Sequence, residues 1–260
     1  MKKILVVPDV HGRTFWKAPV KQYFNEVGRI VFLGDYLDPY KDEDGLANNI
    51  FENLLEIIEL KRENPEKVVL LKGNHDEHYS SIRFRDLASG SRLDYGNWLI
   101  YHQIFNEDKD LFQLARLEKA NDTTYVFTHA GLTEYWINKV NSLLWWLNDW
   151  KISVADPDII EKINMLDTTK EGQELLSIIG ESRSRFGLKA GSVLWADITE
   201  HNYPKAPNVY GLNQVFQVFG HTRLDGSTED MIEGENLAMI DSQKCFMIGA
   251  EKDKKITPIK

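Results

Sequence analysis

Five short, mostly apolar runs limit the folds that are open to this 260-residue chain. Their β-branched and aliphatic residues are typical of buried strands. The runs are residues 4–7, 29–33, 67–71, 124–128 and 215–219. The apolar periodicity of residues 48–62 predicts a helix, and residues 15–27 are expected to be helical despite Pro19. Strands and helices that alternate at this spacing indicate βαβ crossovers and a largely parallel sheet.

The middle of the chain has less regular patterns. Residues 83–122 are polar and rich in aromatic side chains, and we expect them to be mostly helical; residues 151–190 should hold helices and loops. Residues 136–150 contain four of the seven tryptophans. One helical face of this segment would carry Leu143, Trp146, Leu147 and Trp150. We interpret this face as core packing, and a wall of the substrate site is the alternative.

Two further apolar runs lie near the C-terminus. Residues 237–241 and 245–248 are predicted to pair as an antiparallel hairpin. No repeat, low-complexity linker or change of composition divides the sequence. A single domain over residues 1–260 is therefore predicted, with residues 83–122 and 132–200 as candidates for a helical cap.

The composition favours a soluble protein of a reducing compartment. Hydrophobic residues make up 42% and charged residues 27% of the chain, and no apolar run approaches the ~18 residues of a membrane span. The first run ends at Pro8 after four residues, whereas the h-region of a signal peptide needs at least ~7. The single cysteine, Cys245, excludes an internal disulfide and suits the cytoplasm.

The net charge of −9 argues against a large nucleic-acid surface, so we expect no stable nucleic-acid binding and no membrane association. An anionic substrate would then need positive charge from within its own site. A bound metal would supply that charge. The sequence does not indicate an oligomeric state.

Polar residues lie just past the end of each of the five runs. They are Asp9, His11, Asp35, Asn74, His129 and His221. A lone histidine after a strand is more often structural, but parallel strands that end at one sheet edge would bring all six together. Three imidazoles, two carboxylates and an amide oxygen suit Mn, Fe or Zn. Six ligands are too many for one catalytic ion with an open position, and they fit two ions that share a bridging carboxylate.

The order of these motifs resembles the calcineurin-like metallophosphoesterase family. The motifs are Asp9-x-His11, Gly34-Asp35-x-x-Asp38, Gly73-Asn74-His75-Asp76, His129 and Gly220-His221. Residues 34–38, 128–131 and 194–197 are similar to the serine/threonine phosphoprotein phosphatase branch, which includes diadenosine tetraphosphatases. The resemblance implies an α/β fold, a four-layer α/β/β/α sandwich with the metal site at the C-terminal ends of the strands.

The resemblance also implies a role for each motif residue. The first metal would be held by Asp9 and His11, Asp35 would bridge both ions, and the second would be completed by Asn74, His129 and His221. Asn74 would also contact the substrate phosphate. A metal-bridging hydroxide would attack phosphorus, with two Mn ions, or Fe or Zn, in the site. His75, oriented by Asp38, would be the general acid, because a histidine beside a carboxylate donates protons well near neutral pH.

Departures from the family pattern leave the substrate open. Pro39 stands where the phosphatase branch has an arginine that grips the phosphate, and Lys72 stands where an arginine is frequent. Arg223 replaces a histidine that ligates metal in many phosphodiesterases, and it is either a phosphate ligand or an ordinary surface residue. The weaker candidates for phosphate binding are Arg13, Arg183 and Arg185.

The predicted function is hydrolysis of phosphate monoesters, in a phosphorylated protein or a small molecule. The nearest alternative is a hydrolase of dinucleoside polyphosphates or other nucleotides, which would share the metal centre. A phosphodiesterase or nuclease is less favoured, because the chain is acidic and lacks the Gly-His-x-His motif. A non-catalytic scaffold is disfavoured by the complete set of motif residues.

Overall fold

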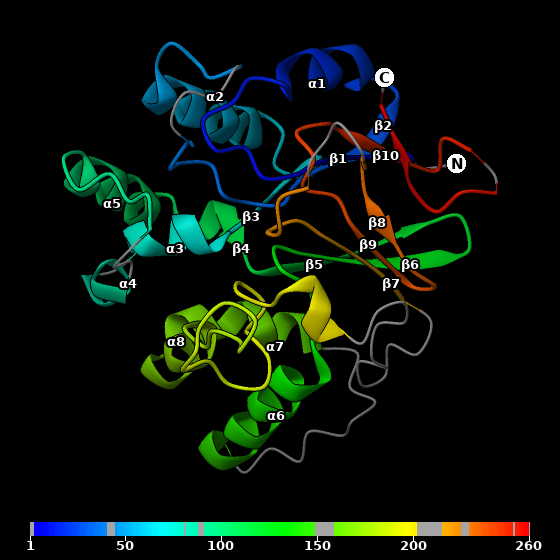
Figure 1. Cartoon of the computed structure of the whole chain (residues 1–260). Coiled ribbons are helices and arrows are strands. Elements are labelled where there is room, and N and C mark those ends of the chain that lie inside the picture. The colour runs from blue at the N-terminus through cyan, green and yellow to red at the C-terminus, as the bar shows by residue number, and fades with distance from the viewer. Residues whose placement is uncertain are drawn as a thin grey trace. The chain divides into compact units, whose positions relative to one another are not determined.

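A computed structural model describes residues 3–40, 45–80, 82–87, 91–148, 159–201, 215–224, 229–251 and 253–259 (Figure 1). The chain divides into two compact units, each with its own sheet. The first unit comprises Met1–Gln113, Asp225–Asp230 and Asp241–Lys260, and the second comprises Leu114–Leu224 and Met231–Ile240. Whether residues 83–122 and 132–200 act as a helical cap on a single domain stays a prediction.

The first unit contains a six-stranded sheet in the order β11-β10-β1-β2-β3-β4. The strands are β1 (Lys3–Val7), β2 (Val27–Phe32), β3 (Val68–Leu71), β4 (Phe112–Gln113), β10 (Phe246–Ile248) and β11 (Thr257–Pro258). Neighbours from β1 to β4 are parallel, whereas β10 and β11 add an antiparallel edge. The predicted largely parallel sheet is confirmed here, since the crossovers between β1, β2 and β3 carry helices.

The helices of the first unit follow local sequence signals. They are α1 (Lys17–Tyr23), α2 (Ile50–Glu63), α3 (Asn74–Ser80), α4 (Ile82–Leu87), α5 (Trp98–Glu107) and the 3-10 turn η1 (Lys109–Leu111). The side chain of Asn49 caps α2 by accepting the amide N–H of Glu52 (3.3 Å). Pro19 lies in the first turn of α1, where a missing N–H costs little.

Alternate residues of the central strands form the core of this unit. Leu5, Ile30 and Leu70 belong to the cluster that also contains the α2 residues Leu54 and Ile58. Residues on the opposite face of the same strands are equally buried. This burial of both faces explains why the strands read as continuous apolar runs rather than as alternating patterns.

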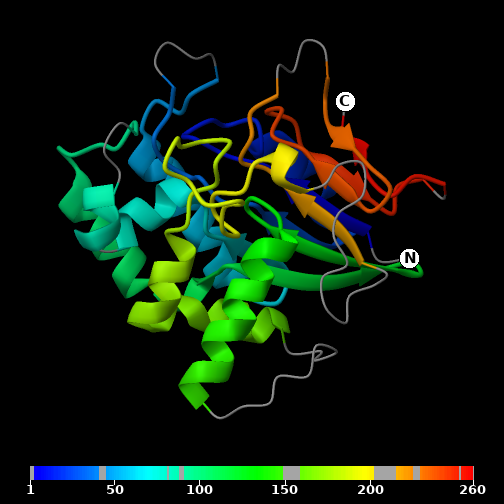
Figure 2. The same ribbon diagram turned by 60° about the horizontal axis from the view of Figure 1, so that its bottom comes forward.

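The second unit contains a five-stranded sheet in the order β5-β6-β7-β9-β8. The strands are β5 (Ala115–Ala120), β6 (Thr123–Thr128), β7 (Val215–Phe219), β8 (Ile232–Glu233) and β9 (Leu237–Met239). The inner strands β6, β7 and β9 are parallel, and β5 and β8 are antiparallel edges. The helices are α6 (Glu134–Asn148), α7 (Ile159–Met165) and α8 (Lys170–Leu176), with the 3-10 turns η2 (Leu166–Thr168) and η3 (Ile198–His201). Figures 1 and 2 show α6, α7 and α8 as one helical group.

Two of the predicted elements are wrong. The C-terminal hairpin does not form, because β9 pairs with β7 and β8 while β10 pairs with β1 and β11. The segment 83–122 is not mostly helical, since its last part forms β4 and β5. Strand β10 pairs with β1 and β4 pairs with β3, which are distant in sequence, and a local pattern does not contain those pairings. Strand β5 pairs with β6, the next strand along the chain.

Three further expectations have mixed outcomes. The mixed α/β class is confirmed, while the stacking of the sheets into four layers remains an implication of the family resemblance. The proposed face of Leu143, Trp146, Leu147 and Trp150 lies largely outside the described side chains. Among the described residues, no helix has both the length and the apolar character needed to cross a bilayer.

Candidate functional site

The first group of candidate ligands lies on the first unit, at the ends of β1 and β2. Asp9, His11 and Asp35 are buried, and one ligand atom from each lies within 4.8 Å of the others. Nδ1 of His11 donates a hydrogen bond to the carbonyl oxygen of Leu37 (2.8 Å). The other ring nitrogen, Nε2, is 3.4 Å from Oδ2 of Asp35. The Leu37 carbonyl therefore fixes the tautomer that leaves Nε2 as a ligand.

The protonation state of His11 also suits metal binding. Burial lowers the pKa of His11 to about 3, although the charge of Asp35 acts in the opposite direction. The imidazole is consequently neutral at pH 7, which is the form that binds metals. Two carboxylates and a neutral imidazole are a donor set that fits a divalent first-row ion such as Mn, Fe or Zn.

Unusual backbone conformations concentrate at the predicted site residues. Among the described residues, six that are not glycine have positive φ, and four of them were predicted as site residues. They are His11 (45°), Asp35 (52°), Asp38 (57°) and His221 (68°). This conformation costs energy for residues with a Cβ atom, and it is retained mainly where the surroundings or the function demand it.

The predicted acid and its partner form a hydrogen-bonded pair on the first unit. Nδ1 of His75 lies 2.8 Å from Oδ2 of Asp38, and the Asp38 side chain is fully buried. The hydroxyl of Tyr79 donates to the other oxygen of Asp38, and the backbone N–H of Asp94 donates to that hydroxyl (2.9 Å). Each oxygen of the Asp38 carboxylate thus has its own hydrogen bond, Oδ2 with the His75 imidazole and Oδ1 with the Tyr79 hydroxyl.

This environment also sets the pKa of His75. Burial lowers it, but the charge of Asp35 and the hydrogen bond with Asp38 together outweigh burial. The result is a pKa raised above the ordinary histidine value. A raised pKa favours the protonated imidazole, as a general acid requires.

Asp76 joins the loop after β2 to the loop after β3. Its Oδ2 accepts the backbone N–H groups of Asp35 (2.7 Å) and Gly73 (2.8 Å), and its Oδ1 accepts that of Tyr36 (2.9 Å). The two loops are so close that a Cβ atom on Gly73 would overlap the Asp35 carboxylate. Asp76 belongs to the Gly73-Asn74-His75-Asp76 motif, and in the structure its side chain connects two loops that carry candidate ligands.

Replacing Asp76 with asparagine should destabilise the protein by about 3 kcal/mol, because asparagine has one acceptor oxygen and would leave at least one of the three buried backbone N–H groups without a partner, at about 1–3 kcal/mol each. The asparagine NH₂ would also face backbone donors. We expect a fall in Tm of about 6–12 °C in calorimetry. Asp86→Asn is the matched control, since Asp86 is exposed on α4 and should change stability by less than about 0.5 kcal/mol. Equal Tm values for the two variants would contradict the role given to Asp76.

Other polar residues around α3 are also buried. Asn74 is the first residue of α3, and the backbone N–H of His75 donates to Oδ1 of Asp35 (2.9 Å). The Lys72 ammonium pairs with Glu77 at 3.4 Å in the interior. His78 lies with Asp38 and His75 in a second group whose ligand atoms are within 4.8 Å of one another.

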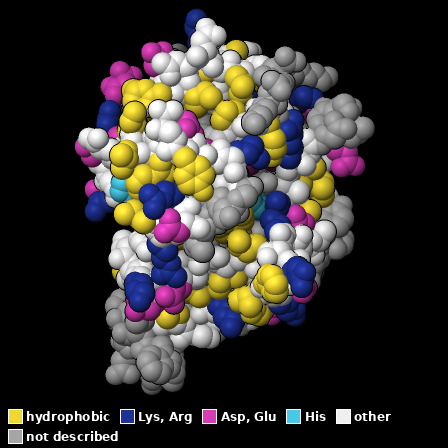
Figure 3. Space-filling model, turned by 60° about the vertical axis from the view of Figure 1, so that its left-hand side comes forward, with side chains coloured by type: hydrophobic (Ala, Val, Ile, Leu, Met, Phe, Trp, Pro, Cys, Tyr) yellow, Lys and Arg dark blue, Asp and Glu magenta, His cyan; other side chains and the backbone are white. Residues whose placement is uncertain are grey.

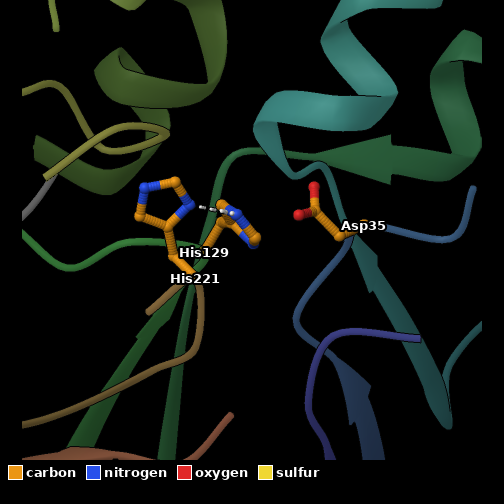
Figure 4. A group of neighbouring side chains, drawn as sticks. All are labelled: Asp35, His129 and His221. Carbon is orange, nitrogen blue, oxygen red and sulfur yellow. Dashed lines mark hydrogen bonds between the residues drawn. The ribbon is translucent and has the colours of Figure 1, made fainter. Parts of the chain in front are cut away.

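The second unit contributes His129 and His221, which follow β6 and β7. Nε2 of His129 lies 3.1 Å from Nδ1 of His221, and Figure 4 draws this contact together with Asp35 of the first unit. The backbone N–H of Gly220 donates to the His129 carbonyl (2.8 Å), which ties the two strand ends together. The pairing of β6 with β7 as parallel neighbours therefore brings two predicted ligands side by side.

His201 supports the loop that carries His129. Its Nε2 donates to the carbonyl of Ala130 (2.9 Å), and its ring stacks on Phe219 with centroids 4.7 Å apart. A Cβ atom on Gly131, which has φ +84°, would collide with this ring. Burial lowers the pKa of His201 to about 4, so the folded protein holds it as the neutral imidazole.

The pKa of His201 predicts a pH dependence of stability. The folded value of about 4 lies below the ordinary 6.5, so the unfolded chain binds a proton more readily. The stabilisation is complete above pH 6.5 and is lost as the pH falls towards 4, with about 2 kcal/mol lost between pH 7 and 5. Urea unfolding at both values should show a smaller loss in His201→Gln. His102→Gln controls for removal of an imidazole, and a wild-type loss in His201→Gln would contradict this account.

The arginines proposed to bind phosphate have different surroundings. Arg13 is buried and donates to the carbonyls of Asp9 (2.8 Å) and Val10 (3.0 Å), so it fastens the turn that carries His11. Arg183 donates to the Thr222 hydroxyl (2.6 Å) and pairs with Asp197 (3.1 Å).

The remaining two arginine candidates lie at the surface. Arg223 is exposed, immediately after Thr222. Arg185 is exposed with its guanidinium 5.0 Å from the ring of Phe186. Their roles in substrate binding stay predictions.

Two residues outside the predicted motifs contact the predicted site, Tyr79 and Arg92. Tyr79 lies four residues after His75 in α3, and residues at this spacing share one face of a helix. A helix predicted over residues 74–80 would therefore have placed Tyr79 beside His75. Arg92 has no motif around it, and its contact with the loop of Asp38 depends on the tertiary fold.

Comparisons with known proteins identify the family of the chain and proteins of similar fold. A family model described as calcineurin-like phosphoesterase matches residues 2–222. The fold is similar to that of a cold-active protein tyrosine phosphatase (TM-score 0.52, 17% identity, 95% of this chain and 74% of that chain). It is also similar to a protein serine/threonine phosphatase from Saccharomyces cerevisiae with similarity to human phosphatase PP5 (0.53, 16%, 99% and 79%). A search of curated proteins gave no match.

Proposed function

Because this chain belongs to the calcineurin-like phosphoesterase family, we propose that it is a two-metal phosphatase that hydrolyses phosphate monoesters. The observation that carries this proposal is the pair of His75 and Asp38, with 2.8 Å between Nδ1 and Oδ2. The same unit holds the Asp9, His11 and Asp35 group, so a proton donor and a metal-binding group belong to one compact part of the chain.

The ligands of both units are proposed to form one dinuclear centre. Asp9 and His11 would hold the first ion, Asp35 would bridge, and the second ion would be held by Asn74, His129 and His221. When bound, such ions supply positive charge to phosphate oxygens and lower the pKa of water. The neutral imidazole of His11 and the buried carboxylates give this set the right donors for Mn, Fe or Zn.

His75 is proposed to donate a proton to the leaving-group oxygen. Its Nδ1 is assigned to Asp38, so Nε2 is the atom that would carry the transferred proton. Asp38 stabilises the protonated ring and fixes its orientation. Tyr79 in turn holds Asp38, so the imidazole cannot rotate without breaking a buried hydrogen bond.

The proposed substrates are phosphorylated proteins or small phosphate esters. The names of the two similar structures, a tyrosine phosphatase and a serine/threonine phosphatase, support a phosphoprotein substrate. A hydrolase of nucleotides or dinucleoside polyphosphates would use the same ligands and the same acid. A cytoplasmic location belongs to the proposal, supported by the single cysteine, which is buried.

The proposal is tested by loading metal-free protein with Mn²⁺ and assaying four substrates in parallel. These are a phosphoserine peptide, a phosphotyrosine peptide, diadenosine tetraphosphate and bis(p-nitrophenyl) phosphate. Turnover of either peptide that needs Mn²⁺ and is lost in His75→Asn would support the phosphatase. Preference for the dinucleotide would replace it with a nucleotide hydrolase, and cleavage of the diester alone would overturn it.

A further inference from the structure

Arg92 lies against the loop that carries Asp38. Its Nε donates to the backbone carbonyl of Asp38 (2.9 Å), and its guanidinium carbon is 3.5 Å from the centroid of the Tyr40 ring. The Tyr40 ring in turn packs edge to face against His11, with centroids 5.5 Å apart. The His11 ring packs in the same manner against His75 (5.1 Å). Arg92 is therefore linked through Tyr40 to His11, and through Asp38 to His75, the two histidines to which metal binding and proton donation are assigned.

The guanidinium of Arg92 has unused hydrogen-bonding capacity. Its Nη2 is buried and has no hydrogen-bond partner among the described residues. The nearby carboxylate of Asp38 is already engaged by His75 and Tyr79. A guanidinium is always charged and carries five N–H donors, so a buried, unmet donor is costly unless an acceptor arrives.

The position of this charge agrees with a site for an anion. Arg92 contacts the backbone carbonyl of Asp38 (2.9 Å), and the side chain of the same residue pairs with His75 (2.8 Å), so the charge lies close to the proposed proton donor. Two other cations near these loops have partners of their own: Arg13 donates to the Asp9 carbonyl, and Lys72 pairs with Glu77. Figure 3 shows one face of the molecule, on which Lys and Arg side chains lie among hydrophobic and acidic ones.

We propose that Arg92 binds a non-bridging oxygen of the substrate phosphate and gives this chain its preference for monoesters over diesters. The inference rests on the proposed phosphatase function. A phosphate monoester dianion carries one more charged oxygen than a diester, and the planar fork of arginine suits such an oxygen. The hydrogen bond to Asp38 and the stack on Tyr40 hold the fork in place.

The test compares Arg92→Ala, Arg92→Lys and the control Arg85→Ala in the Mn²⁺-loaded full-length protein. Arg85 also stacks on an aromatic ring, Trp98 (5.0 Å), but pairs with the exposed Asp86 instead of Asp38. The substrates are p-nitrophenyl phosphate and bis(p-nitrophenyl) phosphate, with inorganic phosphate as inhibitor.

For Arg92→Ala, kcat/KM for the monoester should fall by about 10–100-fold, which is the size expected for a lost charged hydrogen bond. The value for the diester should change by less than about 3-fold, and the inhibition constant of phosphate should rise by about 10-fold, because only the extra charged oxygen loses its partner. Arg92→Lys should recover part of the loss, and Arg85→Ala should match the wild type.

Equal losses on both substrates, with unchanged phosphate inhibition, would overturn the proposal and leave Arg92 as a support for Asp38. If Arg92→Ala does not fold, Arg92→Lys takes its place in the comparison, since lysine keeps the charge but loses the planar fork of donors. A loss on the monoester alone would then support the proposal, and an equal loss on both substrates would overturn it. If the wild type hydrolyses monoesters and neither variant changes the kinetics, only the role of Arg92 is refuted. A wild-type protein that fails on all monoesters refutes the proposed function together with this inference.

Discussion

His75→Asn is expected to lower kcat by about 10²–10⁴-fold, the usual contribution of a general acid. Asparagine retains a polar group near the Nδ1 position, so it can still meet Asp38, but it has no proton to deliver at the Nε2 position. The loss should be large for a phosphoserine peptide, whose alkoxide is a poor leaving group. It should be smaller for p-nitrophenyl phosphate, whose leaving group departs without a proton.

Metal content separates this effect from a damaged site. The backbone N–H of His75 contacts Asp35, and the substitution leaves that contact unchanged, so the metal stoichiometry by elemental analysis should equal that of the wild type. Unchanged turnover of the phosphoserine peptide would show that His75 is not the acid. An equal loss on both substrates would show that its role is not proton donation.

Asp35→Asn should abolish the second metal and lower activity by more than about 10²-fold. The two oxygens of the Asp35 carboxylate make different contacts. Oδ1 accepts the backbone N–H of His75, and Oδ2 faces Nε2 of His11. Asparagine keeps the shape and the first contact but removes the negative charge that would bridge the ions. Replacing partners of metal ligands already costs about 10–100-fold, so a direct ligand should cost more.

Asp38→Asn is the matched control for this variant. It removes a buried carboxylate from the same loop, but one that the proposal excludes from the metal centre. It should lose activity while keeping two ions per chain, as counted by titration of the metal-free protein with Mn²⁺. Two ions bound with wild-type affinity in Asp35→Asn would refute the bridging role.

The inner strands of both sheets were predictable because their local signal is strong. Residues 215–219 were predicted as a strand and form β7 with the same bounds, because a buried strand needs a continuous apolar run. The positions of the candidate ligands followed from the same signal, since each one lies within four residues of the end of such a run. The parallel pairing of β6 and β7 then makes neighbours of His129 and His221.

The edges of the sheets were not predictable in the same way. Strand β5 reads Ala-Arg-Leu-Glu-Lys-Ala, a composition that favours helix, and it is a strand because β6 offers it a continuous antiparallel partner. The contacts of Tyr79 and Arg92 with the Asp38 loop also depend on folding, as they join residues 41 and 54 positions apart. Such contacts have no local sequence signature.

The route of the chain has a consequence for its synthesis on the ribosome. Strand β1 has β2 on one side and β10 on the other, and β10 begins only at Phe246. During translation the whole second unit therefore emerges before β10 can pair with β1 and complete the first sheet. Until then the apolar edge of Ile4–Val6 has no partner strand on that side, and it is open to pairing with other nascent chains. The synthesis of β10 thus determines when this edge of β1 is protected from aggregation.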